Sequence, residues 1–277
     1  MTAWPAGSPQ RPRRSAATRV VLSALSVLSV LVMLGAWESA QALADPAAAC
    51  PVAKLASRPD AATAMAAVTR NASSADIRAF VRQRGARVLT LVGYSGAGYQ
   101  DPAAMLAAAD AVLSQHDPLH TLVNIGATAQ GIGAAYVLAR QRGFTTIGIV
   151  SSLARDEQVA LSPCVDLVFF VADSTWGGRL AGKLRLAPTS AALVANSDDI
   201  VAIGGGDIAR DELLAARRRG KPVRFIPADM DHQAALEKAR TKGQPVPTNF
   251  QGALHAALAA STTPTTSAKS NPRAKPR

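Results

Sequence analysis

The sequence is poor in the residues that build metal centres and aromatic cores. Its 277 residues include only two cysteines, Cys50 and Cys164, and four histidines, with no CxxC motif. Because a structural zinc ion takes four clustered ligands, we expect no metal site. Aromatic residues make up 4% of the chain, so aliphatic side chains must fill its core. We expect Cys164 to be a buried thiol; a disulfide with Cys50 is the alternative if the chain is exported.

Negative charge is missing from both ends of the chain. The net charge is +11, and eight of the positive charges lie in two carboxylate-free ends, at Arg11, Arg13, Arg14, Arg19, Lys269, Arg273, Lys275 and Arg277. The body therefore carries only about +3. Its one basic cluster, Arg217 to Lys221, is typical of a solvated helix C-terminus, where cations balance the helix dipole. We therefore expect no nucleic-acid partner.

The first 44 residues have the pattern of a targeting segment. A basic stretch through Arg19 precedes 18 uncharged residues, Val20 to Trp37, and Ala42-Leu43-Ala44 has the small residues of a cleavage site. Eighteen residues are long for a signal peptide and near the minimum for a spanning helix, so a cleaved signal and a retained membrane anchor both stay open. Either one places the protein on the periplasmic side of a membrane. Translation from Met65 would instead leave it in the cytoplasm.

The remaining chain divides into a linker, one domain and a tail. Residues 45–84 predict a linker and a leading helix near Ser74 to Arg84, and residues 261–277 predict a disordered basic tail. Residues 85–260 contain five apolar runs, followed by a sixth segment, and we predict all six to be strands: Val88–Gly93, Thr121–Ile125, Thr145–Val150, Val165–Val171, Ile200–Ile203 and then Val223–Ile226. Continuous apolar runs between helices indicate parallel strands buried on both faces. We therefore predict an α/β fold, a Rossmann-like, doubly wound and mainly parallel sheet of about six strands with helices on both faces.

A first glycine-rich segment leaves a predicted strand and enters a helix. It contains Gly126, Thr128, Gly131 and Gly133. Free N–H groups at a helix start, approached closely through glycine, predict a cradle for a phosphate. The alternative is that these glycines allow tight packing between helix and strand.

A second glycine-rich segment, Gly204-Gly205-Gly206-Asp207, also follows a predicted strand. Three consecutive glycines are costly to order, so they indicate a backbone that turns sharply or closely approaches another group. Glu212 lies one turn into the next helix. Its carboxylate could bind a ribose or act as a base, or it could simply favour the positive end of the helix dipole.

This second segment resembles the superfamily of the Lonely Guy phosphoribohydrolases and the DNA-processing A protein. Gly205, Gly206 and Glu212 match the family motif, and the resemblance covers roughly Val88 to Ala228. It implies a Rossmann-like fold, a nucleotide-like ligand, a homodimer and a functional role for Glu212.

The sequence also departs from that family. Gly204, Ile208 and Ala209 replace the proline, the third glycine and the threonine of the motif. Thr189 and Ser190 stand where the hydrolases have an arginine–lysine pair that assists cleavage between base and ribose phosphate. These replacements favour a ligand-binding or sensing member over a hydrolase.

The sequence therefore predicts a protein that binds a nucleotide or a nucleotide-derived ligand without a cofactor. If it has N-glycosidic hydrolase activity, Glu212 and Arg185 are the candidate catalytic residues, because Arg185, like Arg179, lies near the missing pair. A non-catalytic sensor or interaction module is the alternative.

Ser95 supports a third interpretation. It lies in a Gly-Tyr-Ser-Gly-Ala turn after a predicted strand, which resembles the nucleophile elbow of α/β-hydrolases. Asp207 or Asp229 and then His232 or His255 follow in the order that such a serine hydrolase would need. That fold normally has several strands before its nucleophile, whereas Ser95 follows the first predicted strand.

In a doubly wound sheet the loops after neighbouring strands meet at one crevice. We therefore expect one site, in which Trp176 could stack on a base. The expected ligand-binding residues are Ser95, Gly96, Gly98, Gly126, Thr128, Gly131, Gly133, Ser151, Gly204, Gly205, Gly206 and Asp207, with Asp173 at the same edge.

Overall fold

The predicted apolar runs form the strands of a parallel sheet. The computed structural model describes residue 50 and residues 68–262. Seven strands pair in parallel in the order β1-β5-β4-β3-β2-β6-β7. Their bounds are β1 (Val68–Asn71), β2 (Arg87–Gly93), β3 (Thr121–Asn124), β4 (Thr145–Ser151), β5 (Leu167–Val171), β6 (Asp199–Ile203) and β7 (Val223–Ile226). The predicted fold class is confirmed, with one strand more than expected.

The additional strand, β1, lies in the segment predicted as a linker. It has four residues and pairs with β5 at the edge of the sheet. A short edge strand has no long apolar run, so the hydrophobic pattern did not indicate it. The leading helix is confirmed as α1 (Ser74–Gln83), which starts with a capping box: Ser73 Oγ accepts from the Asp76 N–H, and the Asp76 carboxylate accepts from the Ser73 N–H at 2.8 Å.

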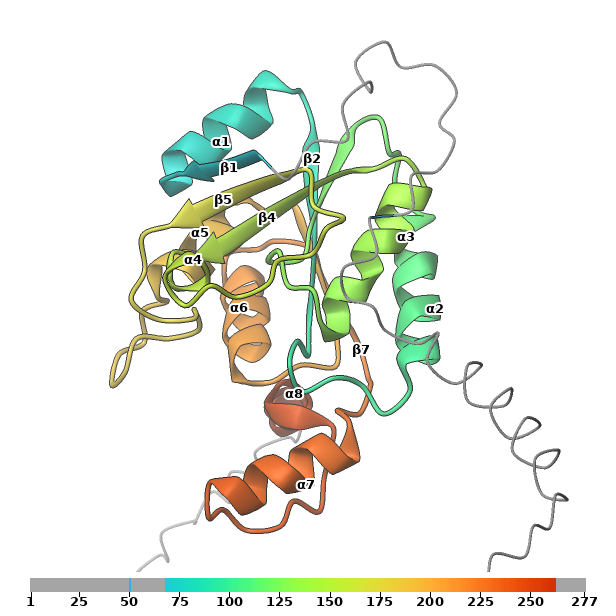
Figure 1. Ribbon diagram of the computed structural model, residues 1–277, viewed down its shortest axis with the longest axis vertical. Helices are drawn as coiled ribbons and strands as arrows, with labels where there is room; N and C mark the ends of the chain where they lie inside the picture. Colours follow the sequence, from blue (N-terminus) through green and yellow to red (C-terminus); the bar gives the residue numbers. More distant parts are fainter. Residues whose placement is uncertain (1–49, 51–67, 263–277) are drawn as a thin grey trace, which may run out of the picture. The chain divides into compact units, whose positions relative to one another are not determined.

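Helices cover both faces of the sheet (Figure 1). Alternate strand residues point to opposite faces, so Leu89 and Leu91 pack with α2 and α3, whereas Val88 and Val92 pack with α1, α5, α6 and α8. The remaining helices are α2 (Pro102–Leu113), η1 (Gly131–Ala134, a 3₁₀ turn), α3 (Ala135–Gln141), α4 (Leu153–Asp156), α5 (Pro188–Asn196), α6 (Asp207–Arg218), α7 (His232–Thr241) and α8 (Gly252–Thr262).

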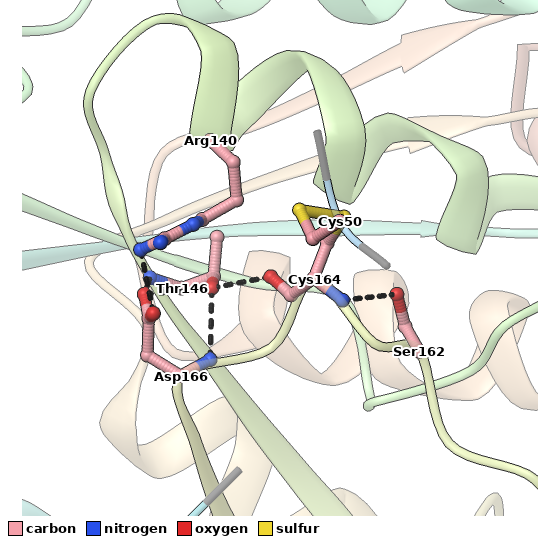
Figure 2. The surroundings of a disulfide bond; sticks show 6 residues. All are labelled: Cys50, Arg140, Thr146, Ser162, Cys164 and Asp166. Carbon is pink, nitrogen blue, oxygen red and sulfur yellow. Dashed lines mark hydrogen bonds and ion pairs between the residues drawn. A yellow bond between two sulfur atoms is a disulfide. The ribbon is translucent and has the colours of Figure 1, made fainter. Parts of the chain in front are cut away.

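A disulfide joins Cys50 to Cys164, so the prediction of a free core thiol at Cys164 is wrong. Figure 2 shows how the second cysteine is held just before β5: its N–H donates to Ser162 Oγ at 3.3 Å, and its carbonyl accepts from Thr146 Oγ1 at 2.7 Å. Asp166, two residues after Cys164, forms an ion pair with Arg140 at 2.5 Å. Cys50 packs against the core on the α2–α3 side of the sheet.

The targeting segment, Met65 and most of the basic tail lie outside the described residues. Among residues 50 and 68–262, no helix is long and apolar enough to span a membrane. The first two residues of the predicted tail, Ser261 and Thr262, form the end of α8.

Candidate functional site

The strand order places a crevice at the carboxyl ends of β2 and β6. From β2 the chain passes through α2 to β3 on one side, and from β5 it passes through α5 to β6 on the other side. Because α2 and α5 cover opposite faces of the sheet, the loops diverge where the strand order reverses. Ligands of such sheets bind at this reversal point.

The larger cleft at this edge lies against the first turn of α6, and we call it the α6 cleft. Its volume is about 500 Å³, within the range of small-molecule sites. One wall is the loop Gly177–Leu184 after β5, and the other consists of Asp207, Ile208, Arg210 and Asp211.

Asp173 fixes the loop that forms the first wall. One carboxylate oxygen accepts from the N–H and the hydroxyl of Thr175, at 2.9 and 2.8 Å, and the other accepts from the Thr189 N–H at 2.8 Å. Burial raises the pKa of Asp173, but the hydrogen bonds from Thr189 and Thr175 outweigh it and lower the pKa. One ionised side chain therefore ties the beginning of the loop to the start of α5.

The N-terminus of α6 offers donors to this cleft. Its N-cap is Gly206, which has no side chain to accept the first N–H groups of the helix. Uncapped N–H groups and the positive end of the helix dipole attract anions. Arg179, Lys183 and Arg210 also line the cleft, so its cations exceed its carboxylates, Asp207 and Asp211, by one.

Asp211 organises two of these arginines. It is 4% exposed and accepts from Arg210 Nε at 3.0 Å and from the Arg179 N–H at 3.1 Å. The Arg179 Nε is buried and lies 3.5 Å from Asp211 Oδ1, within ion-pair range but without a hydrogen bond among the described residues. Asp211 therefore holds Arg179 at the cleft wall through its charge and through the backbone hydrogen bond.

Glu212 lies behind this wall and does not line the cleft. It is 5% exposed, and its Oε1 accepts from Ser190 Oγ at 2.6 Å. The Ser190 hydroxyl in turn accepts from the Gly178 N–H at 2.7 Å, so it separates the carboxyl from the loop. Burial raises the pKa of Glu212 to about 7, and the neighbouring Asp211 adds to the shift.

The second glycine segment is shaped by the protein itself. Gly204 has a φ of +59°, and a side chain there would overlap the ring of Tyr94 and the Ala228 carbonyl. Gly205 has a φ of +137° and accepts a hydrogen bond from the Leu254 N–H of α8 at 3.2 Å. The close approach predicted from the triple glycine exists, and Tyr94 and α8 make it. Gly206 alone has open space around its Cα.

In the first glycine segment, many of the N–H groups that a phosphate would need already have partners. Tyr136 Oη accepts from the N–H groups of Ile125 and Ala127, at 2.8 and 3.0 Å, and Asn124 Oδ1 accepts from that of Gly126 at 3.2 Å. The following helix, α3, has seven residues and begins only at Ala135, after the 3₁₀ turn.

Two glycines of this first segment allow close packing. A side chain at Gly131 would overlap the carbonyls of Tyr94 and Ser95, and one at Gly133 would overlap that of Thr128. The Thr128 hydroxyl accepts from the Gln130 N–H at 3.3 Å within the turn. These contacts favour the packing interpretation of the segment over the phosphate cradle.

The predicted ligand-binding residues do not converge on one cleft. Gly96, Gly98 and Gly131 line a second cleft of about 470 Å³, between α2 and the start of α7, whereas Asp207 lines the α6 cleft. Neither cleft is lined by Gly126, Thr128, Gly133 or Ser151. Ser151 is 1% exposed and its hydroxyl donates to the Asp173 carbonyl at 3.1 Å, a structural role.

The groups of a serine hydrolase do not assemble. Ser95 is exposed, and among the described residues its hydroxyl has no hydrogen bond to a histidine. Asp229 and His232 do pair, at 3.2 Å, but the imidazole stacks on Phe250 with 3.9 Å between ring centroids. A nucleophile without its base does not carry this chemistry.

Arg185 does not line the α6 cleft, although its neighbour Leu184 does. The Arg185 side chain is exposed and forms no ion pair among the residues described, and its carbonyl accepts from the Leu180 N–H at 3.0 Å. The sequence indicated Arg179 only as a neighbour of the missing pair and did not indicate Lys183 or Arg210. The sequence feature that could have indicated the cleft is the Gly177-Gly178 pair after a buried strand, because consecutive glycines there mark a loop that turns back over the sheet.

Comparison with known proteins concerns the fold. No protein-family model matches the sequence, and no curated protein matches it. Similar solved structures include TM1055, a structural-genomics target (23% identity, 50% of this chain and 72% of that chain, TM-score 0.36). The Moco carrier protein of Chlamydomonas reinhardtii is 18% identical over 64% of this chain and 95% of that chain, with a TM-score of 0.38. DNA processing protein A of Streptococcus pneumoniae is 13% identical over 59% and 60%, with a TM-score of 0.35.

The chain has a Rossmann-like fold. The DNA-processing A protein, to which the glycine motif pointed, is among the similar structures. At these identities and scores, the parallel strand order carries the fold assignment.

Proposed function

We propose that the protein binds a small anionic, nucleotide-derived ligand in the α6 cleft and acts as a binding protein. The observation that carries this proposal is the uncapped N-terminus of α6, which borders a cleft of about 500 Å³ together with Arg179 and Lys183. Helix N–H groups and two cations suit a phosphate. A nucleoside monophosphate is of the size that such clefts hold.

Apolar surface beside the cleft suits the base of such a ligand. Trp176 is 43% exposed, next to Gly177 of the cleft wall. Ile208 and Leu184, at 40% and 85% exposed, line the same cleft. A tryptophan with this exposure does not serve mainly to cover the core, so its ring is free to stack on a heteroaromatic base.

Three features support binding over N-glycosidic hydrolysis. Glu212 is enclosed behind Ser190 and lacks contact with the α6 cleft, and a general base must reach the proton that it removes. Thr189 and Ser190 are buried, so the positions of the hydrolases' cations hold no charge here. Arg185 does not line the cleft either.

Calorimetric titration of the purified protein tests the proposal. We expect saturable binding of a nucleoside monophosphate, weaker binding of inorganic phosphate, and no release of base. Lys183→Gln removes one cation from the cleft without touching a structural contact and should weaken binding by about 10-fold or more. Lys238→Gln, an exposed lysine on α7, is the matched control and should leave affinity unchanged.

Three results would contradict the proposal. If mono-, di- and cyclic nucleotides all fail to bind, the ligand is not a nucleotide. A molybdopterin in the same panel tests a different class of ligand. Base release that Glu212→Gln abolishes would establish a hydrolase. Labelling of Ser95 by a serine-reactive probe would restore the serine hydrolase.

We further propose that the domain is exported or anchored on the periplasmic side and that it forms a homodimer. The Cys50–Cys164 disulfide supports export, because such bonds persist in oxidising compartments. The mature N-terminal residue, read by mass spectrometry, distinguishes a cleaved signal from an anchor and from a start at Met65. Sedimentation analysis tests the dimer.

A further inference from the structure

A cluster of exposed arginines lies far from the α6 cleft. We call it the basic face, and it consists of Arg78, Arg82, Arg84, Arg217, Arg218, Arg219 and Lys221. Its six arginines are exposed, and none forms an ion pair with a carboxylate among the described residues. Most other described arginines with comparable exposure do find a carboxylate, as Arg87 and Arg142 do.

The basic face lies at the amino edge of the sheet. α1 ends three residues before β2 begins at Arg87, and α6 ends shortly before β7 begins at Val223. α5 packs against both helices. At its end, Asn196 donates to Ser74 Oγ in the first turn of α1 at 3.0 Å, and Arg78, one turn further along α1, lies close enough to Lys221 to lower its pKa. The arginines of α1 and α6 therefore approach each other through Arg78 and Lys221 at the end of α5, at the opposite end of the strands from the α6 cleft.

Like charges accumulate there with little compensation from carboxylates. Lys221 is partly buried, and its ammonium donates a hydrogen bond to the Ser197 carbonyl at the end of α5. Burial lowers the pKa of Lys221, and Arg219 and Arg78 lower it further, against the opposing effect of Asp198. Asp198 and Asp199 are already engaged, with the Val88 N–H at 2.8 Å and with Arg87 at 3.1 Å. A helix dipole favours cations at its end but does not account for so many unpaired ones.

The N-terminal part of the chain joins the domain at the same edge. Cys50 is bonded to Cys164, three residues before β5, and β1 begins at Val68. Cys50 is 13 residues beyond Trp37, the last residue of the predicted apolar segment, and a stretch of this length can span at most about 45 Å. A retained anchor would therefore keep Cys50 within about 45 Å of a bilayer.

We propose that the basic face docks on an anionic phospholipid surface and that the α6 cleft is thereby left open to solvent. Phosphate headgroups would pair with the arginines for which the described residues offer no carboxylate. This proposal does not depend on the identity of the ligand in the cleft, but it does depend on the N-terminal segment remaining with the chain.

Vesicle partitioning of the full chain tests the proposal. The measured quantity is the ratio of the partition coefficient for vesicles containing one third phosphatidylglycerol to that for pure phosphatidylcholine vesicles. The apolar segment inserts into both kinds of vesicle, so its contribution to partitioning cancels in this ratio. The basic ends are the same in every variant, so their contribution cancels when variants are compared. Arg218→Gln with Arg219→Gln should lower the ratio about 30-fold, since each surface cation contributes about 1 kcal/mol.

Lys238→Gln with Lys242→Gln is the control, because it removes the same charge from the end of α7. We expect this control to leave the ratio unchanged. For the native chain, 0.5 M salt should lower the ratio, because the screening length is then on the order of 5 Å. Equal losses in both double variants would overturn the proposal, as would a ratio near one for the native chain. Amide exchange adds a local readout: anionic vesicles should slow exchange at the ends of α1 and α6, and unchanged exchange there would also overturn it. Tighter binding to DNA than to anionic vesicles at equal salt would assign the face to nucleic acid instead.

Discussion

Removing the disulfide should destabilise the fold by an amount that depends on where Cys50 goes. Cys50 and Cys164 are 114 residues apart, and closing a loop of this length in the unfolded chain is worth about 5 kcal/mol in the chain-entropy model. That figure applies if Cys50 stays in place on the core after reduction. If reduction instead frees residues 50–67, the native state regains the entropy of a loop of about 18 residues, and the difference falls to about 1.6 kcal/mol.

Urea unfolding of the oxidised protein, the reduced protein and the Cys50→Ala/Cys164→Ala variant measures this difference. We expect reduction and substitution to lower the midpoint, with a loss between about 1.6 and 5 kcal/mol. The Cys50→Ala single variant is the control for a free Cys164, which should behave as a small buried apolar residue. An unchanged midpoint in both the reduced and the doubly substituted protein would refute the reasoning.

Three further predictions concern buried groups. Burial raises the pKa of Glu212 to about 7, so the folded state holds this proton more tightly than the unfolded state, and native stability falls as pH rises from about 4.5 to 7. Between pH 5.5 and pH 8 this loss amounts to about 2 kcal/mol, and Glu212→Gln should remove it in urea unfolding at these two pH values. Gly204→Ala should lower the free energy of unfolding by about 1–3 kcal/mol, because residue 204 has a φ of +59° and a side chain there would overlap Tyr94. Gly206→Ala should lower it by under about 1 kcal/mol. Equal losses in thermal unfolding would be inconsistent with this packing. Tyr136→Phe leaves two buried N–H groups without an acceptor and should cost at least about 2 kcal/mol by denaturant titration, and a neutral effect would show that water replaces the hydroxyl.

The sequence predicted the architecture because its apolar runs are long and continuous. β2 to β6 each contain such a run, and burial on both faces of a parallel sheet requires it. β7, an edge strand, contains the exposed Arg224 and is only partly buried. β1 was not predicted, because a four-residue edge strand leaves no comparable pattern. The disulfide was open for a different reason: a pairing across 114 residues depends on the tertiary fold, which brings the two Cα atoms to 4.9 Å.

The candidate site was harder to predict than the fold. A triple glycine correctly indicated a close approach at Gly204, but the approaching group, Tyr94, lies 110 residues earlier and can be identified only in three dimensions. Glu212 was correctly placed one turn into α6, yet its burial behind Ser190 depends on how α5 packs on α6. Lys183 was missed because a single lysine in an irregular loop has no periodicity.

Backbone amide shift mapping tests most directly whether the ligand binds at the N-terminus of α6. Titration of the isotopically labelled protein with a nucleoside monophosphate should shift the amides of Gly177 to Leu184 and of Asp207 to Ala209. Gly96 to Gly98 and Asp231, which line the second cleft, should stay unchanged. Shifts confined to the second cleft, or none at saturating nucleotide, would contradict the account.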